Sequence, residues 1–260
     1  MTLERLELET DDGVARLWLS RPDVRNAFDG RMVTELRAVL DDLAASDSVR
    51  VVVLGGRGRV FCAGADLEWM RAVAGFGREE NLREAQEMAD LFFALYSSPK
   101  PVVARVQGAA LGGGAGLVAA SDIAVAAQGT RFGFTEVRLG LIPAVISPYV
   151  LGKIGESAAR ELFLTGERFE AEKAQEIGLV RVVVPEADLD DAVEDRVREL
   201  LQAGPRAIAE AKTLLRAGAG RRVDDVRQET VERIAAVRAS PEGQEGLRAF
   251  LEKRKPDWAP

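Results

Sequence analysis

The hydrophobic and polar positions at the start of the chain alternate as they do in a β-hairpin. Leucine alternates with polar residues from Leu3 to Glu9, and Val14 to Leu19 repeats that alternation after the turn signal Asp11-Asp12-Gly13. Apolar residues then recur at helical spacing from Met32 to Leu43. The apolar run at residues 50–54 predicts a buried strand. The chain therefore opens as a hairpin, a helix and a strand.

The middle of the chain continues this rhythm. Helical patterns cover residues 66–74 and 79–96, and strand-like segments cover 101–106 and 122–126. A glycine-rich segment, residues 108–116, lies between the two strand-like segments. Strand, glycine loop, helix and strand in succession are typical of an α/β protein.

Beyond Pro185 every pattern is helical. Four helices are expected, over about 187–201, 205–217, 223–239 and 241–253. We therefore predict two parts, a core of residues 1–190 that holds the active site and a C-terminal helical region of residues 191–260.

Composition narrows the function. The chain has 260 residues, a net charge of −7, no histidine and one cysteine, Cys62. The acidic balance disfavours nucleic-acid binding, and the missing imidazole excludes Ser-His-Asp, Cys-His and HExxH chemistry. One cysteine allows no intramolecular disulfide. The N-terminus lacks the pattern of a signal peptide, and the longest charge-free stretch, Val106 to Ser121, is too short to span a bilayer. We expect a cytoplasmic protein without membrane or nucleic-acid partners.

Two glycine-rich loops precede predicted helices. One runs from Gly55 to Asp66, and the other contains Gly112-Gly113-Gly114. Backbone N–H groups at a helix start are unpaired, so two such starts that converge could form an oxyanion hole. The structural alternatives are an Asp66 N-cap in the first loop and close helix–strand packing in the second. Neither loop matches GxxxxGK[ST] or GxGxxG, which disfavours a nucleotide cradle.

One carboxylate lies in a setting suited to proton transfer. Glu136 is flanked by apolar residues and precedes a Gly/Pro turn, where partial burial would raise its pKa. A structural or surface carboxylate is the alternative on this pattern alone.

Four segments, in this order and spacing, resemble the crotonase superfamily, the enoyl-CoA hydratase/isomerase family. They are Ser20–Phe28, Phe61–Leu67, Val106–Ala126 and Thr135–Pro143. The resemblance covers essentially the whole chain. It implies an α/β fold, a spiral of ββα units whose C-terminal helical region makes a trimer or a hexamer.

The resemblance also assigns the predicted site. It implies that the backbone N–H groups of Ala65 and Gly113 hold the carbonyl of an acyl-CoA thioester, with Glu136 as acid/base. The first of the two glutamates usual in the family's hydratases would fall at Gly116, which puts two-glutamate hydration in doubt. Residues expected to border the substrate or its coenzyme A are Arg25, Ala27, Ala63, Asp66, Leu67, Gly116, Arg138 and Lys253. Lys253 or Lys255 would meet the phosphates of coenzyme A from an adjacent subunit, and a solvated basic tail is the alternative. No metal and no cofactor beyond coenzyme A in the substrate is expected.

The reaction implied is hydration of an α,β-unsaturated acyl-CoA. Alternatives are a Δ3,Δ2-enoyl-CoA isomerase, a decarboxylase, or a non-catalytic acyl-CoA-binding relative. The sequences of Gly112–Asp122 and Leu141–Tyr149 resemble those of bacterial hydratases of branched glutaconyl-CoA, the methylglutaconyl-CoA type. These hydratases also lack the first glutamate. Arg138 would then face the distal carboxylate of that substrate, and a surface arginine is the alternative.

Overall fold

Six strands form the larger of two β-sheets in the computed structural model, which describes residues 3–260. The predicted hairpin is present, and every later pair in this sheet is parallel. The register places Val52 beside Ala15 on one side and Val102 on the other. In spatial order the strands are β1 (Leu6–Asp11), β2 (Val14–Leu19), β3 (Val51–Gly56), β4 (Val102–Val106), β6 (Ile123–Ala127) and β9 (Val182–Val184).

A second sheet turns the chain into a spiral. It contains β5 (Ala109–Leu111), β7 (Arg131–Gly133) and β8 (Arg168–Glu170). In the chain, β5 follows β4 and β7 follows β6, and a helix comes after each pair. Each of these turns of the spiral therefore contributes one strand to each sheet before its helix. Single parallel bridges, Phe28 with Ala65 and Cys62 with Ala110, extend the pattern to the earlier turns. The predicted spiral of ββα units is confirmed. The short strands of the second sheet were not predicted, because three residues are too few to show the alternation of apolar and polar positions.

Helices cover both faces of the larger sheet. On one face of β3, Val52 and Leu54 belong to the larger hydrophobic core. On the other face, Val51 and Val53 pack against α7 (Leu189–Gln202). Alternate residues of a strand point to opposite faces, so this strand is apolar throughout. The other helices of the body are α1 (Gly30–Ala45), α2 (Leu67–Val73), α3 (Arg78–Ser97), α4 (Gly113–Ala120), α5 (Ser147–Thr165) and α6 (Ala171–Glu176), with short 3-10 turns η1 (Pro22–Val24), η2 (Glu136–Leu139) and η3 (Glu186–Asp188). Within residues 3–260, no helix is long and apolar enough to cross a membrane.

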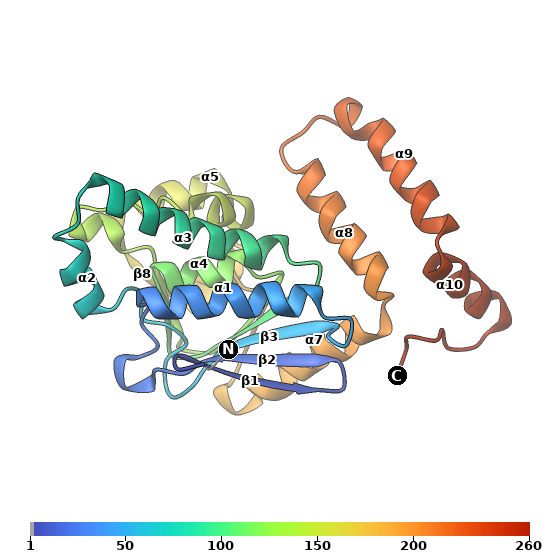
Figure 1. The fold of residues 1–260 in the computed structure, drawn as a ribbon, viewed down its shortest axis with the longest axis horizontal. Coiled ribbons are helices and arrows are strands. Elements are labelled where there is room, and N and C mark those ends of the chain that lie inside the picture. The colour runs from blue at the N-terminus through green and yellow to red at the C-terminus, as the bar shows by residue number, and fades with distance from the viewer. Residues whose placement is uncertain (1–2) are drawn as a thin grey trace.

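The last three helices extend from the body as an arm (Figure 1). They are α8 (Pro205–Gly218), α9 (Val223–Ala239) and α10 (Pro241–Glu252), close to their predicted bounds. The boundary predicted between residues 190 and 191 falls inside α7, which packs on the sheet, so the helices that leave the body begin with α8. The two-part division of function stays a prediction.

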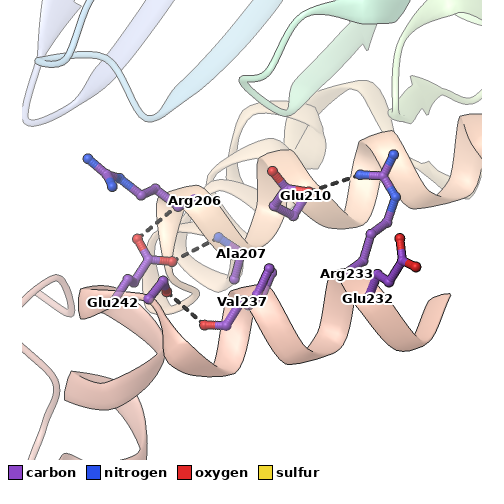
Figure 2. Close-up of a pocket in the computed structure, with 9 residues that line it drawn as sticks. Arg206, Ala207, Glu210, Glu232, Arg233, Val237 and Glu242 are labelled. Carbon is purple, nitrogen blue, oxygen red and sulfur yellow. Dashed lines mark hydrogen bonds and ion pairs between the residues drawn. The ribbon is translucent and has the colours of Figure 1, made fainter. Parts of the chain in front are cut away.

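A cavity of about 450 Å³ lies within this arm, between α8 and α9 (Figure 2). Several of its charged side chains are already paired. Arg233 pairs with Glu210 at 3.1 Å, and the Glu242 carboxylate accepts the backbone N–H groups of Arg206 and Ala207 at the start of α8. These contacts tie the arm's helices together, and none of the predicted site residues lines this cavity.

Candidate active site

The segment between β3 and α2 is fixed against the preceding turn of the spiral. Phe28 N–H donates to the Gly64 carbonyl and Asp66 N–H donates to the Phe28 carbonyl, both at 2.8 Å. Ala65 lies between these two bonds, and its own N–H donates to no acceptor within residues 3–260. The helix begins two residues later than Ala65, at Leu67, because Asp66 is the N-cap. Ala65 is thus a free donor just outside the helix.

A second free donor begins α4. Gly112 N–H donates to the Gly133 carbonyl at 2.9 Å, and the positive φ of Gly112, 51°, turns the chain into the helix. Gly113 is the first helical residue, as predicted. An N–H in the first helical turn has no intrahelical acceptor, and that of Gly113 has no other partner in the described part of the chain.

Both donors border the same cavity as Glu136. The cavity measures about 320 Å³, and its walls come from α2, α3 and the segment before α5. The structure therefore brings together the three residues predicted to be catalytic. The lining consists of Ala65, Trp69, Asn81, Glu84, Ala85, Met88, Gly113, Glu136, Ile142, Pro143, Ala144, Val145 and Ile146.

The carboxylate of Glu136 lies against the glycine loop. Its Oε1 is 3.3 Å from the position that a Cβ would take on Gly112, and its Oε2 is buried with no hydrogen-bond partner among the described residues. Burial raises the pKa of Glu136, and its own backbone N–H opposes that rise only partly. An unpaired carboxyl with a raised pKa beside two free N–H donors can exchange a proton with a bound thioester.

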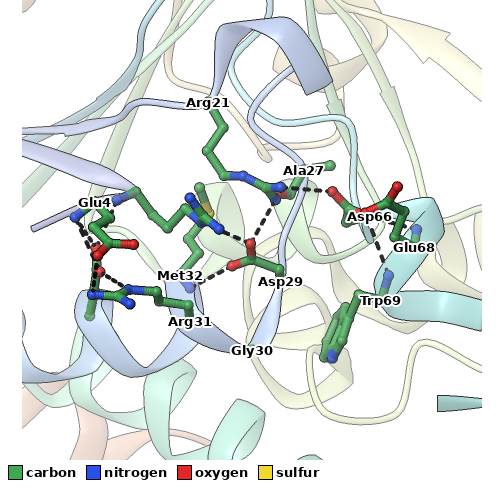
Figure 3. A network of polar contacts seen from close by, with 12 residues as sticks. Glu4, Arg21, Ala27, Asp29, Gly30, Arg31, Met32, Asp66, Glu68 and Trp69 are labelled. Carbon is green, nitrogen blue, oxygen red and sulfur yellow. Dashed lines mark hydrogen bonds and ion pairs between the residues drawn. The ribbon is translucent and has the colours of Figure 1, made fainter. Parts of the chain in front are cut away.

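A half-buried arginine holds the first donor loop in place (Figure 3). Arg21 donates to the Ala27 carbonyl at 2.6 Å and pairs with Asp29 at 3.2 Å and Asp66 at 3.0 Å. Each of these aspartates is also the N-cap of a helix, α1 for Asp29 and α2 for Asp66. One guanidinium thereby fixes two helix starts and the strand segment beside Ala65.

The pKa of Asp66 follows from the same contacts. Burial by itself would raise the pKa of this carboxyl, but the backbone N–H groups of Glu68 and Trp69, together with Arg21, outweigh burial and lower it. Asp66 is therefore ionised at neutral pH and fully engaged by its partners. Its position supports a structural task in the loop.

Comparison with known proteins identifies the fold's family. A family model described as enoyl-CoA hydratase/isomerase matches residues 9–260. The chain belongs to the enoyl-CoA hydratase/isomerase family. The enoyl-CoA hydratase structure from Shewanella pealeana is 44% identical, with a TM-score of 0.95 over 98% of this chain and 96% of that one. That from Mycobacterium smegmatis is 35% identical, with a TM-score of 0.93 over 98% and 99%. A trans-2-decenoyl-[acyl-carrier-protein] isomerase from Streptococcus mutans is 33% identical over 99% of both chains.

This family member is an enzyme of the α/β crotonase fold, and enzymes of this fold act on acyl-CoA substrates. Two of its predicted coenzyme A residues, Arg25 and Ala63, line a second cavity of about 400 Å³. Ala63 and Ala65 belong to one short segment, so the two cavities lie along the same stretch of chain. Arg131 and Arg168 also line the second cavity.

The sequence did not indicate those two arginines. They lie on β7 and β8, which pair antiparallel, with Arg131 opposite Glu170 and Gly133 opposite Arg168. Strands of three residues carry too little pattern to show which side chains share a face. The only available signal was their charge, which does not distinguish them from the other basic residues of this chain.

Other predicted substrate residues of this hydratase/isomerase lie outside both cavities. Ala27 is buried, and its carbonyl accepts from Arg21. Leu67 is 71% exposed at the start of α2. Arg138 donates to the Thr165 carbonyl at 3.2 Å. Lys253 lies at the end of α10, at the opposite end of the molecule from α2 (Figure 1). A role for Lys253 at the site would have to be played from another subunit.

Gly116 is enclosed within the body. It is buried in α4, and it does not line the cavity that contains Glu136. A Cβ built on Gly116 would lie 2.3 Å from Ile146 Cγ2 and 3.0 Å from Phe92 Cε1. Ile146 therefore separates Gly116 from the cavity.

Proposed function

We propose that this protein hydrates an α,β-unsaturated acyl-CoA thioester. The observation that carries the proposal is that two backbone N–H groups without partners among residues 3–260, at Ala65 and Gly113, border one cavity with Glu136. Two donors that converge on a thioester oxygen stabilise the negative charge that develops there when a nucleophile adds to the conjugated double bond. The reactants are the thioester and water, and the protein supplies the donors and the acid/base group.

The acid/base step belongs to Glu136. Water bonds its oxygen to the β-carbon and loses one proton to a base, the double-bond electrons move toward the thioester, and the carbonyl oxygen becomes an enolate held by Ala65 and Gly113. Protonation of the α-carbon then restores the carbonyl. A carboxyl whose pKa is raised by burial supplies such a proton more readily near neutral pH than an exposed one.

Coenzyme A would extend from this cavity into the one lined by Arg25, Arg131 and Arg168. No acidic side chain lines that second cavity, so its three guanidinium groups favour an anion such as the phosphates of coenzyme A. The thioester would pass the segment from Ala63 to Ala65. This placement supports Arg25 and Ala63 as coenzyme A residues and adds two arginines to them.

A second candidate reaction is double-bond isomerisation. The Streptococcus mutans relative is named as an isomerase and matches nearly the whole chain. Moving a proton between the α- and γ-carbons uses the same enolate and a single carboxyl. Both reactions pass through an enolate, but isomerisation removes a proton from the α-carbon and returns one to the γ-carbon, whereas hydration adds water at the β-carbon.

Hydration of a branched glutaconyl-CoA remains the finer form of the proposal. Its distal carboxylate needs a cationic partner, and neither lysine nor arginine lines the cavity around Glu136. Arg138 is turned toward the Thr165 carbonyl instead. For this substrate class, the partner would have to come from a neighbouring subunit.

We also propose that the arm joins copies of the chain into a trimer or a pair of trimers. Large apolar side chains are exposed on all three of its helices, among them Leu215, Ile234, Phe250 and Leu251. Exposed apolar side chains gathered in one region mark an association surface. Sedimentation of the purified protein measures its mass, and a monomer at micromolar concentration would contradict the assembly.

A panel of thioesters tests the reaction. Hydration removes the absorbance of the conjugated enoyl-CoA, isomerisation of a β,γ-enoyl-CoA creates it, and decarboxylation releases carbon dioxide. We expect loss of the conjugated absorbance with at least one α,β-unsaturated member of the panel. Binding of acyl-CoA without any turnover would support the non-catalytic alternative and contradict the proposal.

A further inference from the structure

The helix that follows the second donor has no room for another carboxylate. A side chain at Gly116 would require both Ile146 and Phe92 to move, since the first Cβ contact is only 2.3 Å. Backbone and core packing fix these two residues, which are buried. If water is activated by a group other than Glu136, that group must come from another wall of the cavity.

The helix α3 presents such a group. Asn81, Glu84, Ala85 and Met88 line the cavity, at the spacing of three and four residues that places side chains on one helix face. The same part of α3 carries three further glutamates, and all of these are exposed, whereas Glu84 is half-buried. The exposed ones are Glu79, Glu80 and Glu87.

The surroundings of Glu84 disfavour its charged form. Burial raises the pKa of Glu84, a hydrogen bond from Trp69 opposes that rise, the nearby charge of Glu87 raises it further and Arg83 lowers it. Glu136, which also has a raised pKa, is the other titratable group on the cavity wall, and no cation lines that wall. The cavity therefore presents two carboxyl groups, each with a raised pKa.

We propose that Glu84 is the second acid/base residue of this active site and activates the water that adds to the β-carbon. This assignment rests on the proposed hydratase function. Glu136 lies beside Gly112, next to the donor that holds the thioester oxygen, so it serves the adjacent α-carbon. Glu84 lines the same cavity from the α3 wall.

The protons balance across the two carboxyls. The Glu84 carboxylate accepts a proton from water while the water oxygen bonds to the β-carbon. The protonated Glu136 gives its proton to the α-carbon as the enolate returns to a carbonyl. Glu84 then holds one proton more and Glu136 one fewer, and exchange with solvent restores the starting state.

Two measurements on Glu84→Gln separate this role from a structural one. The first is hydration of the enoyl-CoA that the wild type hydrates fastest. The second is exchange of the α-protons of the corresponding saturated acyl-CoA in heavy water, which uses the oxyanion donors and Glu136 but no water at the β-carbon. We expect hydration to fall ~10²-fold while α-proton exchange stays within about threefold of wild type.

Matched variants define the comparison. Glu79→Gln, on the same helix but exposed, should match wild type in both measurements. Glu136→Gln should lose both. Glu84→Asp keeps a carboxyl and should hydrate at least about fivefold faster than Glu84→Gln. The pH profile of kcat should lose one of its two limbs in Glu84→Gln, and thermal unfolding should show that each variant is folded.

The outcomes are distinguishable. A wild type that hydrates no member of the panel overturns the proposed function and this inference with it. A wild type that hydrates, with Glu84→Gln as fast, overturns the inference alone. Equal loss of hydration and α-proton exchange in Glu84→Gln would also overturn it, because Glu84 would then act on the whole site rather than on water.

Discussion

Two helices show how differently the two regions of this molecule are built. In the body, α4 is buried from Gly114 to Ala120, and its first residue is a proposed oxyanion donor. In the arm, α9 runs from Val223 to Ala239 without one buried residue, although Val231 and Ile234 are apolar. A helix that is buried on all sides holds the N–H group of its first residue in a fixed position. A helix with an uncovered apolar side needs another surface.

The polar contacts of the two regions differ in the same way. In the body, Arg21 and Asp66 have side chains that are only 16% and 9% exposed and pair with several partners each. In the arm, pairs such as Arg233 with Glu210 are largely solvated, and solvated pairs contribute little to stability. We therefore expect substitutions in the body to change turnover at constant mass, and substitutions in the arm to change assembly.

The largest expected effect on turnover is at Glu136. Glu136→Gln keeps the shape but cannot transfer a proton, so kcat should fall at least ~10²-fold while acyl-CoA binding persists. Steady-state kinetics and calorimetric binding of a saturated acyl-CoA measure the two quantities. Near-full activity of this variant would show that another group performs the proton transfer at the α-carbon.

Removing a backbone donor should have the next largest effect on turnover. Ala65→Pro deletes an N–H that makes no bond within the protein, so kcat should fall ~10²-fold with little change in KM. Ala65→Gly keeps the donor and is the matched control. Gly113 is less suitable for this test, because a Cβ there would lie 3.1 Å from Phe28. Equal kinetics for the proline and glycine variants would contradict the oxyanion role.

Arg21 should have a smaller effect on turnover, because it acts through the loop rather than on the substrate. Arg21→Lys keeps the charge but loses the fork that reaches Ala27, Asp29 and Asp66, and kcat should fall about tenfold. An unreactive conjugated acyl-CoA reports the cause, since its absorption moves to longer wavelength as its carbonyl is polarised. The shift should be smaller in Arg21→Lys than in wild type. An unchanged shift would mean that Arg21 only stabilises the fold.

Substitutions in the arm should change the mass of the assembly and leave the fold of each chain unchanged. Phe250 and Leu251 are 81% and 78% exposed, so Phe250→Asp with Leu251→Asp removes apolar contact area without disturbing the core of one chain. We expect a smaller species in sedimentation, with helix content unchanged. An unchanged mass would place the association surface elsewhere on the chain.

The smallest expected effect is that of Glu136→Gln on thermal stability. This substitution should stabilise the fold, although it lowers activity. A carboxyl whose pKa is raised by folding is stable in its protonated form, and its stabilising contribution is lost as pH rises through the folded-state pKa. At pH 7, Glu136→Gln should therefore unfold at a higher temperature than wild type. The difference should shrink as the pH falls below the raised pKa. A lower unfolding temperature at pH 7 would contradict the burial of this carboxyl.

The sequence by itself determined most of the regular structure. Apart from α5, the long helices and central strands lie within a few residues of their predicted bounds, because burial of a face imposes a period of 3.6 or 2 over many residues. It also indicated Glu136, Gly113 and Ala65, through glycine loops at strand ends and the resemblance of whole segments. These are local features, which depend on neighbours in the chain.

Only the tertiary structure decided which distant residues share a site. Arg21 meets Asp66 across 45 positions, Arg131 and Arg168 meet through strands of three residues, and Glu84 differs from its exposed neighbours only because α3 turns that face toward the cavity. The closure of Gly116 by Ile146 is equally invisible in the chain's pattern. These contacts join segments that lie far apart in the sequence, and their geometry follows from the packing of the spiral rather than from any local propensity.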